Sequence, residues 1–263
     1  MTGDLDLDRL LAAADDAARA GGAVVSERFR DTVAPREKGP GDWVSEVDTE
    51  SERVIRAALA ESAPGLPVFG EEEGGERADV GWLVDPLDGT SNFLHGFPVV
   101  GVSVALVVDD VPVVGVVHAP LLRTTYVACA GKGATVDGVP MRVSDRPPVR
   151  AICATGFPFR AKADKLPEYF PVFERALRRF EDLRRAGSAS LDLAWTAAGV
   201  FDGYFEQALG PWDVAAGALL VREAGGVVTD WAGDDGAWLW SGDIVAAPAA
   251  VHASTLEVIR GSR

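Results

Sequence analysis

Cysteine is scarce in this sequence. Cys129 and Cys153 are the two cysteines among 263 residues, and they lie far apart along the chain. Two distant thiols exclude a disulfide framework and a cysteine-rich metal knuckle. We therefore expect both to be reduced thiols of a cytoplasmic protein.

Long hydrophobic runs are missing as well. The longest candidate covers residues 97–108, which is shorter than the roughly 20 residues that a membrane-spanning helix needs. The first ten residues, MTGDLDLDRL, are acidic, so they do not match a secretory signal peptide, which starts with basic residues. We expect no membrane span, no membrane partner and a cytoplasmic location.

Basic residues are outnumbered by acidic ones. Twenty-five lysines and arginines face 40 aspartates and glutamates, which gives a net charge of −15. A chain with this balance repels the phosphate backbone of nucleic acid, so we expect no direct nucleic-acid partner. An anionic substrate would need local help from cations or helix N-termini.

Apolar residues are plentiful, at 48% of the chain. Helical spacing predicts helices over 4–30 and 45–61, and Ser45 and Asp48 suit the start of the second helix. Strand-like apolar runs alternate with further helical segments near 166–179, 187–199 and 211–226. This order predicts an α/β (α+β) protein. We expect a single domain over residues 1–263, with subdomains of about 1–148 and 149–263.

Turn residues predict three local details. Residues 33–41 are rich in proline, glycine and charge and predict a loop. Pro86 is expected to end the strand VGWLVDP, because proline cannot donate to a sheet ladder. The pair Asp109-Asp110 divides two apolar runs and predicts a β-hairpin.

Acidic residues recur where predicted strands end or helices begin. They are Glu71 and Glu72 after VFG, Asp85 and Asp88 in DPLD, and Asp213 in PWDVAAG. A single acid in such a place is usually a helix cap or a solvated loop residue. Residues 84–92 hold no lysine or arginine, and carboxylates gathered without basic partners repel one another unless a divalent cation joins them. Because all these ligand atoms are oxygens, the sequence favours Mg²⁺.

The residues that follow these acids suit a phosphate group. Gly89 allows close approach of the backbone, and Thr90, Ser91 and Asn92 favour the start of a helix, whose N–H groups bind phosphate oxygens. Carboxylates for a metal beside amides for phosphate indicate a metal-dependent phosphomonoesterase.

The motifs also carry a family resemblance. GEE, DPLDGTSNF and WDVAAG resemble the three signatures of the inositol monophosphatase family. TGFPFRAKADK, RRAGSASLDLAW, DGYFEQALGPWD and LLVREAGG are similar to its bacterial SuhB-type members. The resemblance extends from about Leu7 to Val258. It implies a layered α/β/α/β/α sandwich of the inositol monophosphatase and fructose-1,6-bisphosphatase type, a homodimer, two to three Mg²⁺ ions per active site, and inhibition by lithium.

The resemblance also assigns site residues. Glu71, Asp85 and the Leu87 carbonyl would hold one metal, Asp85, Asp88 and Asp213 a second, and Glu71 would assist a third. The catalytic residues would be Asp48, Thr90 and Glu71, with Thr90 orienting the attacking water. The substrate would be bound by Asp88, Gly89, Thr90, Ser91, Gly187, Ser188, Ala189, Glu206 and Asp213. The loop around Lys38 is a residue shorter than in many relatives, so no role is carried over to Lys38.

The implied activity is hydrolysis of inositol monophosphates, which are small phosphorylated polyols, by direct attack of metal-activated water. Histidinol phosphate, fructose 1,6-bisphosphate and 3′-phosphoadenosine phosphates are the alternative substrates within the family. A haloacid-dehalogenase-type phosphatase fits less well, because Asp85 and Asp88 are three positions apart and are expected on opposite faces of a strand. In another class of function, the chain would be a regulatory partner of the transcription machinery.

Overall fold

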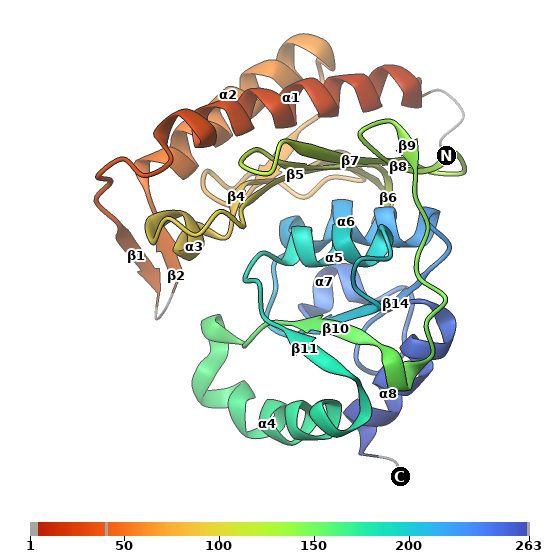
Figure 1. Cartoon of the computed structure of the whole chain (residues 1–263). Coiled ribbons are helices and arrows are strands. Elements are labelled where there is room, and N and C mark those ends of the chain that lie inside the picture. The colour runs from red at the N-terminus through yellow and green to blue at the C-terminus, as the bar shows by residue number, and fades with distance from the viewer. Residues whose placement is uncertain (1–4, 40–41, 262–263) are drawn as a thin grey trace.

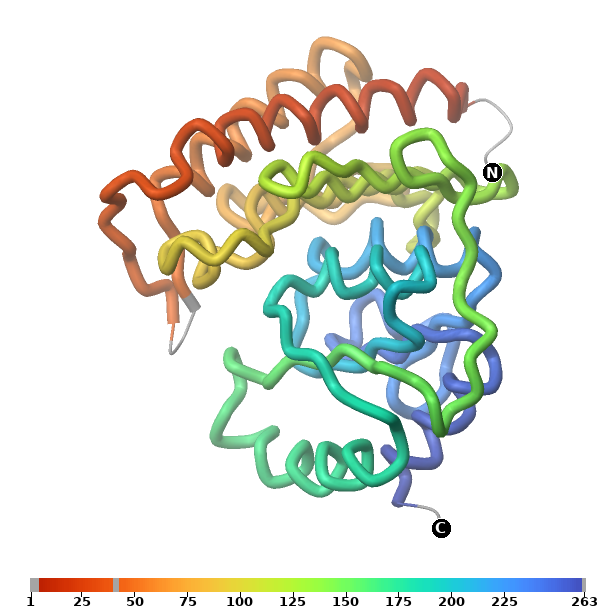
Figure 2. The backbone as a smooth tube through the Cα atoms, viewed as in Figure 1, coloured from red at the N-terminus to blue at the C-terminus, as the bar shows by residue number. Residues whose placement is uncertain are grey.

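Five layers of secondary structure are stacked in the computed structural model, which describes residues 5–39 and 42–261 (Figure 1). From the top of the view they are a helix pair, a seven-stranded sheet, a second helical layer, a five-stranded sheet and an outer helical layer. The first half of the chain forms the upper layers and the second half the lower ones (Figure 2). The predicted layered α/β/α/β/α sandwich is confirmed.

The top layer consists of α1 (Leu7–Arg28) and α2 (Glu46–Ser62). The Asp6 side chain accepts a hydrogen bond from the Arg9 N–H at the start of α1. Ser45 and Asp48 form a capping box at the start of α2, as their spacing predicts. Both helices bury their apolar faces against the sheet below, in a core that includes Leu10, Val25, Ile55 and Leu59. The start of the predicted first helix at Asp4 lies outside the described residues.

The first sheet has the strand order β3-β4-β5-β6-β7-β8-β9. The β3–β4 pair is parallel and the other pairs are antiparallel. The strands are β3 (Val68–Gly70), β4 (Val80–Asp88), β5 (Gly101–Val108), β6 (Val111–Ala119), β7 (Thr124–Cys129), β8 (Gly133–Val136) and β9 (Val139–Pro140). Asp109 and Asp110 both have positive φ between β5 and β6, which is the conformation of a type I′ hairpin turn. The predicted hairpin is confirmed.

Pro86 does not end its strand, so this prediction was wrong. β4 continues through Pro86 to Asp88, and its register with β5 shifts between Asp85 and Asp88. Asp85 pairs with Ser103 and Asp88 with Gly101, so β4 has one more residue than β5 between these pairs. The strand bulges there, which is where a sheet tolerates proline. Since the partner positions are two apart, both acids point to the same face, and the expectation of opposite faces was wrong as well.

The second helical layer lies between the two sheets and contains α5 (Ala189–Ala197) and α6 (Pro211–Glu223). Pro211 opens α6, where its missing N–H costs nothing. Both helices are buried along almost their whole length. They pack against the first sheet on one side and the second sheet on the other. Two further helices are short. α3 (Thr90–Leu94) follows β4, and α7 (Trp238–Ser241) lies between β13 and β14 in sequence.

The second sheet has the order β11-β10-β12-β14-β13. Its strands are β10 (Ile152–Thr155), β11 (Asp182–Arg184), β12 (Gly203–Glu206), β13 (Val227–Thr229) and β14 (Ile244–Ala247). The outer layer below it is formed by α4 (Lys162–Arg179) and α8 (Ala249–Arg260). Two 3₁₀ turns, η1 (Pro148–Arg150) and η2 (Phe159–Ala161), lie on either side of β10. α4 begins four residues before the predicted start at residue 166.

The predicted loop over residues 33–41 is partly a strand. β1 (Arg36–Gly39) pairs with β2 (Asp42–Val44) in a separate two-stranded sheet, while Pro40 and Gly41 lie outside the described residues. Three of the four residues of β1 are charged, so its sequence lacks the alternation of apolar and polar residues by which a strand is predicted. The division into subdomains of 1–148 and 149–263 stays a prediction. In the described part of the chain, no helix combines the length and apolarity needed to cross a bilayer.

Candidate active site

A cavity of about 420 Å³ collects the predicted site residues from both halves of the chain. It is lined by all the residues that the resemblance assigns to metal or substrate: Glu71, Asp85, Leu87, Asp88, Gly89, Thr90, Ser91, Gly187, Ser188, Ala189, Glu206 and Asp213. Asp48 is buried behind Thr90 and reaches the cavity through it. Their grouping is therefore a property of the fold, while their individual roles stay predictions.

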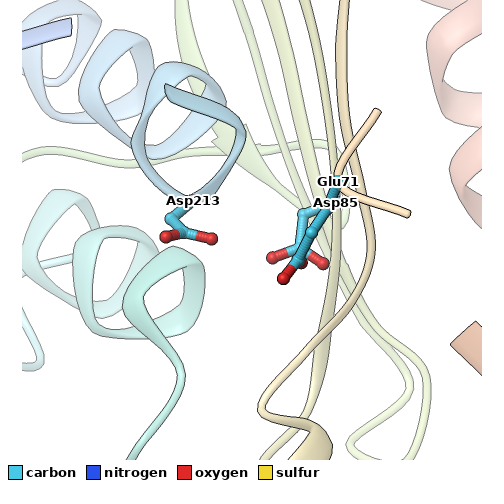
Figure 3. Close-up of side chains that lie close together, drawn as sticks. All are labelled: Glu71, Asp85 and Asp213. Atoms are coloured by element: carbon cyan, nitrogen blue, oxygen red, sulfur yellow. The ribbon is translucent and has the colours of Figure 1, made fainter. Parts of the chain in front are cut away.

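Three carboxylates converge inside this cavity. Glu71 follows β3, Asp85 lies in β4 and Asp213 is in the first turn of α6. One oxygen from each lies within 4.8 Å of the other two, and Figure 3 shows the side chains gathered between α6 and the first sheet. We call Glu71, Asp85 and Asp213 the carboxylate trio.

The crowding of these acids changes their protonation. Burial, followed by the negative charge of Asp213, raises the pKa of Glu71 to about 7. Burial and the charge of Glu71 raise the pKa of Asp85 well above its usual range. Protonation relieves the repulsion between such groups, and a bound cation would relieve it too.

Asp88 stands beside the trio and is held differently. Its Oδ2 accepts hydrogen bonds from the Ser188 hydroxyl at 2.7 Å, the Ser190 hydroxyl at 2.5 Å and the Ser190 N–H at 2.7 Å. These donors belong to the start of α5, so Asp88 joins the first sheet to the second half of the chain. Asp88 does not belong to the described group whose oxygens lie within 4.8 Å, and its assignment to a second metal stays a prediction.

Thr90 and Asp48 are paired, as the resemblance implies. The Thr90 hydroxyl donates to Asp48 Oδ1 at 2.7 Å and lies 3.2 Å from the Leu87 carbonyl oxygen. Asp48 Oδ2 accepts from both the N–H and the hydroxyl of Ser45. Burial raises the pKa of Asp48, against the effect of these hydrogen bonds. With its proton directed to Asp48, the Thr90 oxygen is left as an acceptor toward the cavity.

Glu206 lines the cavity from the end of β12 in the second sheet. Its Oε2 accepts a hydrogen bond from the Tyr204 hydroxyl at 2.6 Å. Burial raises the pKa of Glu206 to about 7 although this hydrogen bond lowers it. Glu206 is thus a partly buried strand residue facing the cavity and not an exposed loop acid.

Basic partners for the acids come from segments far away in the sequence. Lys38 Nζ lies 3.0 Å from Glu71 and 2.7 Å from Glu72. Arg160 contacts Asp213 at 2.7 Å and Glu71 at 3.1 Å. The expectation of an acidic cluster without basic partners, drawn from residues 84–92 alone, was therefore wrong. Lys38, to which no role was carried over, is in direct contact with a member of the trio.

Sequence reasoning missed part of the cavity lining. The additional residues are Trp43, Phe157, Phe159, Arg160, Lys162, Arg185, Ala208 and Leu209. The motif TGFPFRAK contains four of them, but nothing in its spacing directs their side chains to acids elsewhere. Three of the eight are cations, which supply the local help that an anionic substrate needs in a chain of net charge −15.

Glu52 supports the loop that carries Glu71 and was also missed. It is fully buried in α2. Its carboxylate accepts the N–H groups of Glu72 at 2.8 Å and Glu73 at 3.1 Å, and the Arg56 Nε at 2.8 Å. A Cβ at Gly70 would lie 2.2 Å from this carboxylate, so only glycine fits there. Glu52 therefore contacts the backbone at Gly70, before Glu71, and at Glu72 and Glu73, after it, and so fixes the position of Glu71.

The donor set of the trio fits a hard divalent cation. All three side chains offer oxygen, burial and the charge of neighbouring acids raise the pKa of Glu71 and Asp85, and an open cavity adjoins them. Mg²⁺ is typically held by a few carboxylates and keeps other positions for water and phosphate oxygens. The described residues around the trio offer no histidine or cysteine that would favour a softer metal.

Comparisons with known proteins concern the family and the fold. Residues 6–262 match the model of the inositol monophosphatase family. A protein named putative Nus factor SuhB from Neisseria meningitidis serogroup B is 44% identical over 233 residues, covering 87% of this chain and 88% of its own. The crystal structure of extragenic suppressor protein suhB from Bartonella henselae superposes with a TM-score of 0.91 at 33% identity, covering 97% of this chain and 99% of the other.

An inositol monophosphatase from Anabaena (Nostoc) sp. PCC 7120 superposes with a TM-score of 0.87 at 31% identity. The match covers 98% of this chain and 97% of that one. The family match, the sequence identities and the shared fold all extend over nearly the whole chain. This protein belongs to the inositol monophosphatase family, a family of phosphatases.

Proposed function

We propose that the protein is a Mg²⁺-dependent phosphomonoesterase that hydrolyses inositol monophosphates to inositol and phosphate. The observation that carries this proposal is the convergence of the carboxylate trio beside the Thr90–Asp48 pair in one cavity. Glu71, Asp85 and Asp213 would hold the cation, with the Leu87 carbonyl and Asp88 as further ligands. A bound cation would act as a Lewis acid toward the phosphate oxygens and would lower the pKa of a water molecule bound to it.

The protein's own residues then orient the reactants. Asp48 accepts a hydrogen bond from the Thr90 hydroxyl, so the Thr90 oxygen is left to accept a hydrogen bond from the attacking water and to orient the lone pair of that water toward phosphorus. Gly89, Thr90 and Ser91 bind the phosphate, and the cavity cations add attraction for its charge. Water attacks phosphorus directly, and no side chain becomes phosphorylated.

The polyol is recognised by lining residues from the second half of the chain. Glu206 accepts hydrogen bonds from the substrate hydroxyls, and Gly187, Ser188 and Ala189 border the ring. Inositol monophosphates therefore are the proposed substrate, ahead of histidinol phosphate, fructose 1,6-bisphosphate and 3′-phosphoadenosine phosphates.

The test is phosphate release by the purified protein from these four substrates, compared by kcat/KM. We expect activity with Mg²⁺, the highest value for inositol monophosphate, and loss of activity in excess chelator that added Mg²⁺ restores. Asp85→Asn should lose activity in every case. Full turnover in excess chelator would overturn the metal dependence, and a higher kcat/KM for another substrate would replace inositol phosphate.

A regulatory function is the second candidate. It is favoured by the name Nus factor that similar proteins carry. This reading would make the chain a partner of the transcription machinery, with or without catalysis. A folded protein that binds Mg²⁺ but hydrolyses none of the four substrates would favour it over the phosphatase.

Two further parts of the proposal derive from the family resemblance. We propose a homodimer in solution, which light scattering on the purified protein would measure, and inhibition by millimolar lithium. A monomer at all concentrations, or lithium-insensitive turnover, would remove the corresponding part and leave the phosphatase proposal standing.

A further inference from the structure

The guanidinium of Arg160 lies on two members of the carboxylate trio. Its Nη1 is 2.7 Å from Asp213 Oδ2 and its Nη2 is 3.1 Å from Glu71 Oε1. These acids come from opposite sides of the cavity, one from α6 and one from the loop after β3. A single positive group therefore bridges two of the three acids that would hold a divalent cation.

We propose that Arg160 is an internal competitor of the divalent cation: it neutralises Glu71 and Asp213 in the metal-free protein and must leave them for the metal to bind. The proposed function enters only in taking the trio as a divalent-cation site. Protonation or a positive partner relieves the repulsion between crowded carboxylates, and Arg160 would be such a partner whenever the metal is absent.

The hydrogen bonds at the two oxygens favour displacement over sharing. Glu71 Oε1 already accepts from Lys38 Nζ at 3.0 Å, and Asp213 Oδ2 from the Gly210 N–H at 2.7 Å. With Arg160 added, each oxygen has two donors, which matches its two lone pairs. A cation that reaches either oxygen must displace a donor. The Gly210 N–H is fixed in the backbone at the start of α6, whereas the Arg160 side chain is 36% exposed and can turn toward solvent.

The charge of Arg160 acts in the same direction. A guanidinium within hydrogen-bond distance of two ligands repels an incoming divalent cation. Lys162 is a suitable comparison, because it lines the same cavity and carries the same charge. Its Nζ lies over the Phe159 ring, 5.0 Å from the centroid, and among the described residues it has no ion pair with the trio. Comparing variants of Lys162 and Arg160 thus separates the effect of a positive charge in the cavity from the effect of direct contact with the acids.

The position of Arg160 in the chain couples metal binding to a local motion. Arg160 belongs to η2 on the connection between β10 and α4. The ion pairs with Glu71 and Asp213 tie this connection to the loop after β3 and to α6. Release of the guanidinium would remove both of these ties from residues 156–162, while the Phe157 ring would still pack on Tyr169 and Phe173.

Calorimetric titration with Mg²⁺ at constant pH and ionic strength tests the competition in wild type, Arg160→Gln and Lys162→Gln. We expect Arg160→Gln to lower the apparent Kd about tenfold, equivalent to about 1.4 kcal/mol, and Lys162→Gln to lower it by less than about threefold. Equal effects of the two variants, or weaker Mg²⁺ binding by Arg160→Gln, would overturn the inference while leaving the proposed function intact. No binding by any of the three proteins would overturn both.

Hydrogen exchange provides the second readout. Without substrate, Mg²⁺ should speed amide exchange in residues 156–162 of the wild type. In Arg160→Gln exchange should be fast already and change little with Mg²⁺. Equal protection of this segment by Mg²⁺ in both proteins would show that Arg160 stays in place and would overturn the displacement.

Discussion

Single residues in the cavity divide into those that would act on the phosphate, those that would act on the alcohol, and those that hold the others in position. The Thr90–Asp48 pair belongs to the first group, since its 2.7 Å hydrogen bond directs the hydroxyl proton away from the cavity. Glu206 belongs to the second and Glu52 to the third. Each leads to a prediction that separates its role from a general effect on folding.

Thr90→Ala should lower kcat by about 10²-fold or more, with little change in KM, because the lost hydroxyl orients water in the transition state. Asp48→Asn should act in the same direction. Steady-state kinetics with inositol phosphate measures both. An acid-stable phosphate trapped on Asp85 or Asp88 would contradict direct attack by water.

Glu206→Ala should lower kcat/KM for inositol phosphates roughly 10- to 150-fold, since hydrogen bonds to a charged group contribute about 1.5–3 kcal/mol. Hydrolysis of an aryl phosphate should hardly change, because that substrate has no hydroxyls to lose. Tyr204→Phe is the control, as it removes the hydrogen bond to Glu206 and keeps the carboxylate. Equal losses on both substrates would assign Glu206 to the scaffold.

Glu52→Gln should weaken Mg²⁺ binding although Glu52 lines no part of the cavity. The amide keeps one acceptor oxygen, but its NH₂ group must face the N–H of either Glu72 or Glu73. We expect a loss of about 1–3 kcal/mol in the free energy of unfolding. Displacement of Glu71 should also raise the Mg²⁺ Kd at temperatures where the variant is folded. Glu61→Gln, exposed near the end of the same helix, is the matched control. Unchanged Mg²⁺ affinity would show that Glu52 stabilises the fold but does not position Glu71 for Mg²⁺ binding.

At the scale of elements, the turn from β4 into α3 positions most of the site. The bulge at Asp85–Asp88 directs both acids to one face, and Gly89 then turns the chain with φ +94°. A Cβ on Gly89 would lie 2.9 Å from the Val99 carbonyl oxygen and 3.2 Å from that of Gly187. The turn is therefore packed against the loop before α5, and Asn92 ties it there by donating to the Ala186 carbonyl at 2.9 Å.

Gly89→Ala should lower the free energy of unfolding by more than Gly131→Ala. Both residues have positive φ, but a Cβ at Gly131 would meet nothing within 4 Å. The conformational cost alone is about 1 kcal/mol, which we expect for Gly131→Ala, and the close contacts at Gly89 should at least double it. Denaturant unfolding gives both values. Equal losses in the free energy of unfolding would mean that the loops around Gly89 can move to accommodate the added methyl group.

For the whole molecule, charge is the property that links stability to function. The net charge is −15, and acids from several layers meet in one cavity. Burial and neighbouring acids raise the pKa of Glu71 and burial raises that of Glu206, each to about 7 from the ordinary 4.5. A carboxyl whose pKa is raised by folding favours the folded state while it is protonated. Its stabilising effect is complete below pH 4.5 and is lost as the pH rises through about 7.

The melting temperature of the metal-free protein should therefore fall between pH 6 and pH 8, and Mg²⁺ should raise it more at pH 8 than at pH 6. Thermal melts in chelator and in Mg²⁺ measure both effects. The double variant Glu71→Gln, Glu206→Gln should show a smaller fall, because two of the responsible groups no longer titrate. The same fall in the variant would assign the pH dependence to the general negative charge of the molecule.

The sequence by itself determined the local features and the chemistry of the site. Spacing and capping residues predicted α1 and α2, the pair Asp109-Asp110 predicted its hairpin, and the carboxylates of Glu71, Asp85 and Asp213 predicted an oxygen-rich site. These succeed because helical period, caps and turns depend on neighbours a few positions apart. The motifs predicted the family, and with it the layered fold, because together they extend over nearly the whole chain.

Only the tertiary structure decided which charges meet. The bulge at Pro86 depends on the pairing of β4 with β5, and no local rule reveals that register. Lys38 and Arg160 reach the trio, and Glu52 its supporting loop, from segments distant in sequence. Periodicity reports whether a residue is buried but not which partner it finds, since the free energy of an ion pair depends on distances that folding alone sets.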